Sequence, residues 1–396
     1  MNKELKKGLI YGVLSTVAAL TIGNTGHMVY KNHFAENIDY NRKAAAIYSL
    51  MEENYIGDID EAELYEGIYT GMFYKSTDQY STYISAKDFE DYKIRTSGNY
   101  VGVGIIMSID SDDYSIVTKV VYEQSPAYKS GIRPGDKLIM VEGTPVNYEN
   151  YGEAIDMIRG KEGTEVNLKL YRPAENNTYE VTVVRESVKQ PTVATALIDD
   201  VGYMKISGFE EVTFDQYKEA LNNLRAKNIN SLIIDLRDNP GGLLDQVTLI
   251  ADDIIPEGVI TYTENKAGKR EYINSDANQV DIPIVVLVNE HSASASELLS
   301  AAIKDTKKGI IVGKNTYGKG VVQTTFPFVD GSAVKMTTAK YFTPNGICID
   351  GEGIKPDVEV DNPVDYELPV VSGTTIEYNL DFDSQLNKAI SILKDN

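Results

Sequence analysis

A run of serines and alanines, Ser292 to Glu297 (S-A-S-A-S-E), has the composition of a nucleophile site. It follows the apolar segment 282–288 and opens a segment with helical spacing, so we predict a strand-to-helix turn there. Small side chains would let a substrate backbone approach, and a helix N-terminus favours negative charge that develops during a reaction. Ser294 followed by Glu297 is equally a capping box, which begins a helix without any catalysis. From this run alone both interpretations stay open.

Lys319 lies between two glycines in the segment Gly313 to Gln323 and precedes an apolar run. As a phosphate-binding loop, G-x-x-x-x-G-K-[ST], the segment fails at Gly320, which replaces the hydroxyl that would bind magnesium. A lysine among apolar neighbours can instead act as a base if burial lowers its pKa from about 10.4 by roughly three units. The sequence therefore favours base chemistry over nucleotide binding at Lys319.

The counts of the titratable residues exclude several classes of site. The 396 residues include 38 Lys+Arg and 59 Asp+Glu, which gives a net charge of −21 and argues against a large nucleic-acid surface. One Cys excludes an internal disulfide and a multi-Cys zinc site. His27 and His33 lie near the N-terminus, so a Ser-His-Asp triad could use only His291. His291 is three positions from Ser294 across a predicted turn, a poor position for the base.

The periodicity of apolar residues predicts the elements that position these groups. Helical spacing from about 38 to 90 is followed from Gly98 by short β-rich runs between Gly and Pro, with one helix at 151–159. From about Val201 strands alternate with helices, which predicts a mostly parallel α/β core. The predicted core strands are 231–236, 282–288 and 309–313, its helices begin near 243 and 294, and an amphipathic helix covers 383–393.

The N-terminal segment has the pattern of an export signal. Residues 1–7 hold three Lys and one Glu, and residues 8–23 carry no charge. The apolar stretch reaches the length of a membrane span only by crossing Asn24 and His27. We expect an uncleaved signal-anchor over residues 1–30 that leaves the bulk of the chain outside the cytoplasm, with a cleaved signal peptide and a buried helix as alternatives.

The β-rich region resembles a PDZ domain from Gly98 to about Arg185. The resemblance rests on G-V-G-I (Gly102, Val103, Gly104 and Ile105), S-P-A at 125–127, G-I-R-P-G-D at 131–136 and the helix at 153–159. Glycines at 102 and 104 would turn backbone N–H groups toward the terminal carboxylate of a peptide, and the next strand would pair with that peptide. Arg133 is a candidate sensor of the carboxylate, and an exposed loop arginine without a specific role is equally compatible.

Together, the serine run and G-K-G-V-V-Q at 318–323 resemble the carboxyl-terminal processing peptidases, or tail-specific proteases, which use a Ser/Lys dyad. The 25 positions from Ser294 to Lys319 match the spacing in that family and select the middle serine. Further matches are D-L-R-D-N-P-G-G at 235–242, Asp305, and the patches at 78–83, 341–349 and 353–357. The resemblance covers about residues 38 to 394. His291 departs from it, because a small residue commonly precedes the serine run.

The resemblance implies a role for each matched residue. Ser294 would be the nucleophile, Lys319 the base, and Gln323 would orient Lys319, since positions i and i+4 of a strand share a face. The backbone N–H groups of Gly241, Gly242 and Ala295 are the candidate oxyanion hole. Asp305 is a candidate for catalytic support, or it simply caps the end of the helix that Ser294 begins.

The resemblance also implies the fold and the partners. We expect a crotonase/ClpP-like α/β protease core with an inserted PDZ domain and helical segments at both ends, and no metal or organic cofactor. Protein or peptide substrates would bind through their C-termini, and helices at 38–75 and 383–393 would pair in a homodimer. The predicted segments are 1–30 (signal-anchor), 31–97 (helical), 98–185 (PDZ), 190–370 (peptidase core) and 371–396 (tail and helix).

We therefore predict a membrane-associated serine endopeptidase. Its rivals are a non-catalytic PDZ scaffold on a degenerate protease core and, less favoured, an ATP-using enzyme.

Overall fold

The computed structural model describes residues 40–364 and 366–395. The predicted signal-anchor at 1–30 lies outside the described residues. Within those ranges no helix is both long enough and apolar enough to span a bilayer. The chain divides into two compact units, one ending at Gly71 and one beginning at Met72.

The described part of the first unit, from residue 40, is mainly helical, as the spacing from residue 38 predicts. Helix α2 covers Tyr40–Asn54, and α3 (Glu61–Tyr74) runs through the boundary between the units. Neither helix contains a buried residue. Their exposed large apolar side chains include Ile47, Leu50, Ile68 and Met72.

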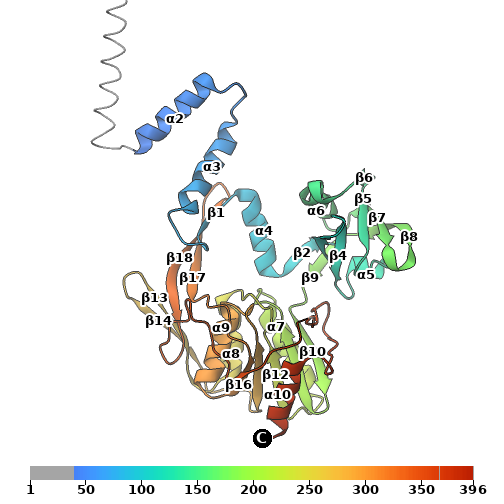
Figure 1. Ribbon diagram of the computed structural model, residues 1–396, viewed down its shortest axis with the longest axis vertical. Coiled ribbons are helices and arrows are strands. Elements are labelled where there is room, and N and C mark those ends of the chain that lie inside the picture. Colours follow the sequence, from blue (N-terminus) through green and yellow to red (C-terminus); the bar gives the residue numbers. More distant parts are fainter. Residues whose placement is uncertain (1–39, 365, 396) are drawn as a thin grey trace, which may run out of the picture. The chain divides into compact units, whose positions relative to one another are not determined.

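The second unit is built on a six-stranded sheet in the order β10-β11-β12-β15-β16-β19. Figure 1 labels β10, β12 and β16 of this sheet, next to α10. The strands β11 to β19 pair in parallel and β10 is an antiparallel edge strand, which confirms the predicted mostly parallel core. Their bounds are β10 Val193–Ile198, β11 Val201–Ile206, β12 Ser231–Asp235, β15 Ile284–Val288, β16 Gly309–Gly313 and β19 Val358–Glu359.

Helices cover both faces of this sheet. Leu232 and Ile234 pack on the face covered by α7 (Thr213–Arg225), α8 (Leu244–Ile254) and α9 (Ala295–Asp305). Ile233 packs on the other face against α10 (Ser384–Lys394). Because alternate residues are buried on opposite faces, these strands have unbroken apolar sequences.

The C-terminal helix packs its apolar stripe within the chain. Leu386 and Ala389 of α10 are buried against the sheet, together with Ile390. The predicted pairing of residues 383–393 between subunits would therefore have to use another face of this helix, and it stays a prediction.

A second sheet, which the sequence did not predict as such, contains the strands that follow Lys319. Its path is β1-β18-β13-β14, and β17 pairs with β18. The bounds are β1 Thr82–Ile84, β13 Gly258–Asn265, β14 Arg270–Ser275, β17 Val321–Pro327 and β18 Ala333–Phe342. Thr82 pairs with Lys335, so the segment before α4 (Ala86–Ser97) is joined to the strands beside the candidate base.

The β-rich region forms a separate sheet in the order β3-β4-β5-β7-β8, with β6 beside β5. It has its own core, in which Ile116, Ala154 and Leu168 are buried. A two-stranded ribbon, β2 (Asn99–Gly102) with β9 (Glu186–Lys189), connects it to the rest of the chain. The other bounds are β3 Ile105–Ile109, β4 Ile116–Val121, α5 Pro126–Lys129, β5 Lys137–Val141, β6 Thr144–Pro145, α6 Tyr151–Ile158, β7 Glu165–Arg172 and β8 Asn177–Val184, with short 3₁₀ turns at Tyr148–Asn150 and Pro173–Glu175.

Candidate active site

Two loops at one edge of the parallel sheet form the frame of the site. One follows β12 and the other follows β15, and neighbouring parallel strands end at the same edge. The Ala293 N–H donates to the Asn239 carbonyl at 3.0 Å, and Asn289 Nδ2 donates to Asp238 Oδ1 at 2.7 Å. Backbone and side-chain bonds thus join the D-N-P-G-G segment to the serine run.

Ser294 occupies the sharp turn that begins α9. Its φ of +56° and ψ of −112° form a backbone conformation that non-glycine residues rarely adopt. Backbone strain of this kind persists only where the surrounding structure fixes it. A strained strand-to-helix turn that exposes a serine hydroxyl is the geometry of a nucleophile elbow.

The hydrogen bonds distinguish Ser294 from its two neighbours in the run. Ser292 Oγ donates to the Leu236 carbonyl at 2.8 Å, and Ser296 Oγ donates to the Asn239 carbonyl at 2.9 Å. Both of these serines are fully buried, whereas Ser294 is half-buried. Within the described chain the Ser294 hydroxyl donates no hydrogen bond. The geometry therefore favours the same serine as the spacing to Lys319.

The loop after β12 approaches Ser294 closely enough to require glycine. A Cβ atom on Gly241, whose φ is +104°, would lie 2.9 Å from Ser294 Cβ and 3.0 Å from the Ala295 nitrogen. The Gly241 N–H, however, donates to Asn239 Oδ1 at 2.8 Å. It is thus not free to serve as the predicted oxyanion donor. The N–H groups of Gly242 and Ala295 have no hydrogen-bond partner among the described residues, so they remain the candidate pair.

Lys319 lies in the loop before β17 and is half-buried. Burial lowers the pKa of its ammonium below the ordinary value, and the positive charge of Lys335 lowers it further, while Asp78 and Glu297 oppose both effects. Lys319 Nζ lies over the ring of Tyr80, 4.7 Å from the ring centroid. In the described part of the chain no hydrogen bond joins Lys319 Nζ to Ser294 Oγ.

The structure does not bring the other predicted residues to these atoms. Gln323 Nε2 donates to Thr337 Oγ1 at 3.2 Å and not to Lys319, which lies before β17 rather than on it. Asp305 accepts from the Asn345 N–H at 3.0 Å, at the opposite end of α9 from Ser294. The predicted support by Asp305 therefore has no contact to act through. His291 is exposed in the turn before the serine run.

Glu297 links the two catalytic segments, a role that the capping-box interpretation missed. Its side chain is fully buried, and its two carboxylate oxygens accept four hydrogen bonds. Oε2 accepts from the backbone N–H groups of Ser294 at 2.7 Å and Lys319 at 2.9 Å. Oε1 accepts from Thr316 Oγ1 and from the Gly318 N–H, both at 2.6 Å. One carboxylate thus fixes the backbone of both residues.

A buried ionic network lies beneath the oxyanion loop. Arg237 Nη2 contacts Asp235 Oδ2 at 2.6 Å, and Arg237 Nη1 contacts Asp383 Oδ1 at 2.8 Å. All three side chains are at most 1% exposed. Burial raises the pKa of Asp235, but the positive charges of Arg237 and Lys205 outweigh burial and hold it below its ordinary range. The arginine therefore ties the loop after β12 to α10, and the sequence motif D-L-R alone did not indicate this partner.

A groove of about 540 Å³ runs between β3 and α6 of the β-rich domain. Residues 102–105 line it, as predicted, together with Ile155 and Ile158 of α6 and Arg95 of α4. Arg133 does not line it. The Arg133 guanidinium donates to the carbonyls of Tyr128 and Ile132 at 2.9 and 2.8 Å and lies over the Tyr128 ring.

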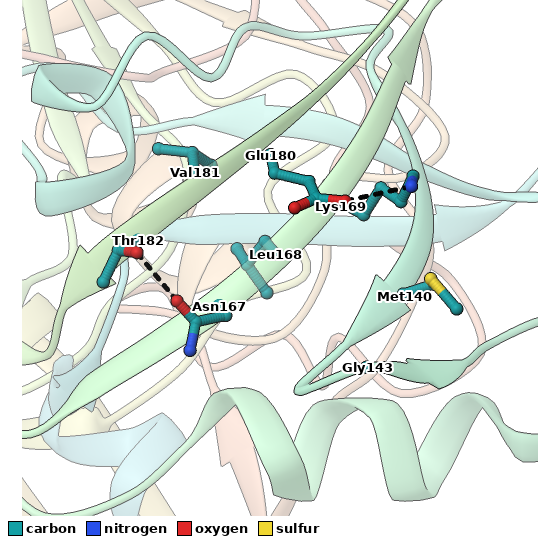
Figure 2. A pocket seen from close by; sticks show the side chains of 8 residues that line it. All are labelled: Met140, Gly143, Asn167, Leu168, Lys169, Glu180, Val181 and Thr182. Atoms are coloured by element: carbon teal, nitrogen blue, oxygen red, sulfur yellow. Dashed lines mark hydrogen bonds and ion pairs between the residues drawn. The ribbon is translucent and has the colours of Figure 1, made fainter.

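A smaller hollow of about 240 Å³ lies over β7 and β8 on the same domain (Figure 2). Its polar side chains bond across the two strands. Lys169 Nζ contacts Glu180 Oε1 at 3.0 Å, and Thr182 Oγ1 donates to Asn167 Oδ1 at 2.7 Å (Figure 2). These are cross-strand pairs that stabilise a sheet, and they suggest no ligand.

Comparisons with known proteins identify the family of the chain and the kinds of domain that it contains. Residues 200–360 match the model of peptidase family S41, residues 117–172 match a PDZ domain, and residues 6–88 match the N-terminal domain of the activating protease CtpB. The carboxy-terminal processing protease CtpA of Bacillus subtilis is 32% identical over 401 residues, which cover 100% of this chain and 85% of that protein. A carboxy-terminal-processing protease of Bartonella bacilliformis is 32% identical over 326 residues, which cover 80% of this chain and 74% of the relative.

A candidate S41 protease of Bacteroides fragilis has a similar solved structure. The TM-score is 0.54 with 16% sequence identity, and the match covers 86% of this chain and 93% of that one. This likeness supports the α/β fold, and the match at residues 117–172 supports the PDZ domain within it.

Proposed function

This chain belongs to the carboxy-terminal processing proteases of peptidase family S41, and on that premise we propose that it is a Ser/Lys endopeptidase that recognises the C-terminal tails of its substrates. The observation that carries the proposal is the strained turn at Ser294. Its half-buried hydroxyl accepts the capping bond from the Glu297 N–H but donates no hydrogen bond within the described chain, whereas the hydroxyls of Ser292 and Ser296 donate to backbone carbonyls. Lys319, whose pKa burial lowers, is the proposed base.

In the proposed reaction, neutral Lys319 takes the proton from Ser294 Oγ as that oxygen attacks the carbonyl carbon of the scissile bond. The N–H groups of Gly242 and Ala295 donate to the oxyanion. Lys319 then gives its proton to the leaving amine, and water hydrolyses the ester formed at Ser294. The first step requires a hydrogen bond between Lys319 Nζ and Ser294 Oγ, and Lys319 Nζ meanwhile lies over the Tyr80 ring.

The packing of the Lys319 loop argues against the ATP-using alternative. A Cβ atom on Gly320 would lie 2.1 Å from the Asp350 nitrogen, so the hydroxyl residue of a phosphate-binding loop has no room there. The Gly318 N–H already donates to the Glu297 carboxylate, which would repel a phosphate. The glycines thus serve close packing. The non-catalytic scaffold predicts loss of Ser294, Lys319 or Gln323, and all three residues are present.

The proposal also covers location and assembly. We retain an extracytoplasmic position with an N-terminal membrane segment, supported by the charge and hydropathy pattern of residues 1–30. We also propose a homodimer that forms through α2 and α3. Exposed apolar side chains of these helices support it, such as Ile47 and Leu50, which are 50% and 58% exposed. Protease accessibility in intact cells tests the first, and light scattering of an Ile47→Glu variant tests the second.

Cleavage of a peptide with a free, apolar C-terminus tests the catalytic proposal. We expect Ser294→Ala to abolish turnover. Ser300→Ala is the matched control, because its hydroxyl bonds only to the Ser296 carbonyl within α9 at 2.7 Å, and it should retain turnover. Undiminished cleavage by Ser294→Ala would refute the assignment of the nucleophile.

A further inference from the structure

The groove of the PDZ domain is lined in part by a helix that precedes that domain. Ile94 and Arg95 belong to α4, which precedes the ribbon strand β2, and both line the groove with Gly102 and Val103. The Val103 carbonyl accepts from the Ala127 N–H at 2.9 Å, and the Gly104 carbonyl accepts from the Tyr122 N–H at 3.0 Å. Gly102 pairs with Glu186 in the β2–β9 ribbon, whereas the N–H groups of Val103 and Gly104 have no hydrogen-bond partner among the described residues. These two N–H groups are therefore the donors of the turn that could bind a carboxylate in the groove.

The charged side chains that line the groove are positive, and only one of them is paired with a carboxylate. Its charged lining residues in the described chain are Arg95 and Arg159. Arg159 Nη1 is held by Asp91 Oδ1 at 2.6 Å, whereas no ion pair or hydrogen bond of the described residues involves the Arg95 side chain. Burial lowers the pKa of the Lys335 ammonium, and the charge of Arg95 lowers it further. Lys335 is therefore a second positive group close enough to Arg95 for the two charges to interact.

We propose that Arg95 is the group that binds the terminal α-carboxylate of a substrate tail, in place of the Arg133 that the sequence suggested. Arg133 is turned onto Tyr128 and its own loop carbonyls, away from the groove lining. The Arg95 guanidinium is exposed and has no partner among the described residues, and it lines the groove together with the apolar side chains of Ile155 and Ile158. This combination fits a peptide that has an apolar last side chain and a free carboxylate. This inference rests on the proposed recognition of tails and assigns the residue responsible for it.

The consequence is that tail recognition involves the helix next to the catalytic segments. Helix α4 follows β1, which pairs with β18. Lys335 Nζ of β18 lies 5.8 Å from the centroid of the Tyr92 ring in α4. Tyr80, whose ring lies under Lys319 Nζ, is in the segment immediately before β1. A tail bound by Arg95 would therefore contact α4, which continues the segment that places Tyr80 against Lys319.

The test uses the full chain carrying Ser294→Ala, so that binding is measured without cleavage. The probes are two fluorescent decapeptides that end in the same three apolar residues, one as the free acid and one as the carboxamide. Fluorescence anisotropy should give a Kd about tenfold lower for the acid, the size expected for one charge-assisted contact. Arg95→Gln should weaken binding of the acid by about tenfold and remove the difference between acid and amide.

Arg133→Gln is the matched control and should keep both the affinity and the preference for the acid. Arg95→Lys, which retains the charge, should recover part of the preference, and circular dichroism checks that each variant is folded. A full acid preference in Arg95→Gln, or its loss in Arg133→Gln, overturns the assignment to Arg95 alone. Absence of binding of either peptide to the parent protein would instead refute the proposed recognition of tails, and with it this inference.

Discussion

Glu297→Gln tests whether one buried carboxylate positions the catalytic segments. The substitution keeps the size of the side chain but replaces one acceptor oxygen by an NH₂ group. On the Oε2 side that group would face the N–H groups of Ser294 and Lys319, and on the Oε1 side it would face the Gly318 N–H. The least damaging orientation is therefore on the Oε1 side, where Thr316 Oγ1 can turn to accept a hydrogen bond.

Even that orientation leaves one buried N–H unsatisfied and weakens the remaining charge-assisted bonds, at a cost of about 2–4 kcal/mol. We expect the melting temperature to fall by several degrees and kcat/KM for a tail peptide to fall by about 10–100-fold. Thermal melting and initial rates, both measured on the same preparation below its unfolding transition, separate the two effects. Wild-type values of both would refute the role of Glu297, and a lowered melting temperature with unchanged kcat/KM would reduce it to a structural one.

Three further substitutions follow from the charges and the close packing around the site. Because Lys319 must be neutral to act as a base, kcat/KM should rise as pH increases through its pKa, so Lys335→Met, which removes a cation, should raise that pKa and move the rise to higher pH. Asp78→Asn removes an anion and should move the rise to lower pH; shifts of equal sign in the pH–rate profiles of the two variants would contradict the electrostatic account. Gly241→Ala should reduce kcat/KM by about 100-fold, since the new Cβ would lie 2.8 Å from the Ala293 carbonyl oxygen and displace the turn that begins α9. The control Gly67→Ala, where nothing lies within 4 Å, should have wild-type kinetics, and a normal rate for Gly241→Ala would show that the close approach does not matter.

The parallel core could be predicted from sequence because burial on both faces leaves a strong local signal. Strands such as β12 and β15 are continuous apolar runs, and helices between them have a 3.6-residue period. The second sheet has no such signal. The burial of β18 varies along its length and β1 has three residues, so their pairing depends on contacts more than 200 residues apart in sequence.

The candidate site could be predicted only in part, for a related reason. Ser294 and Lys319 were selected by their own chemistry and by a spacing that resembles a family. Glu297 was read as a helix cap, because its bonds to Gly318 and Lys319 exist only once α9 and a loop 21 to 22 residues away lie together. The role of the Gly241 N–H was wrong for the same reason, since Asn239 takes that donor within the folded loop.

The initial rate of tail-peptide cleavage by Lys319→Met tests the central claim most directly. Methionine keeps much of the apolar stem of lysine but cannot take a proton from Ser294. With Lys319 as the base, the rate should fall by about 10³-fold or more relative to wild type, while His291→Ala should retain activity. Near-wild-type turnover in Lys319→Met, or loss of turnover in a folded His291→Ala variant, would contradict the Ser/Lys dyad.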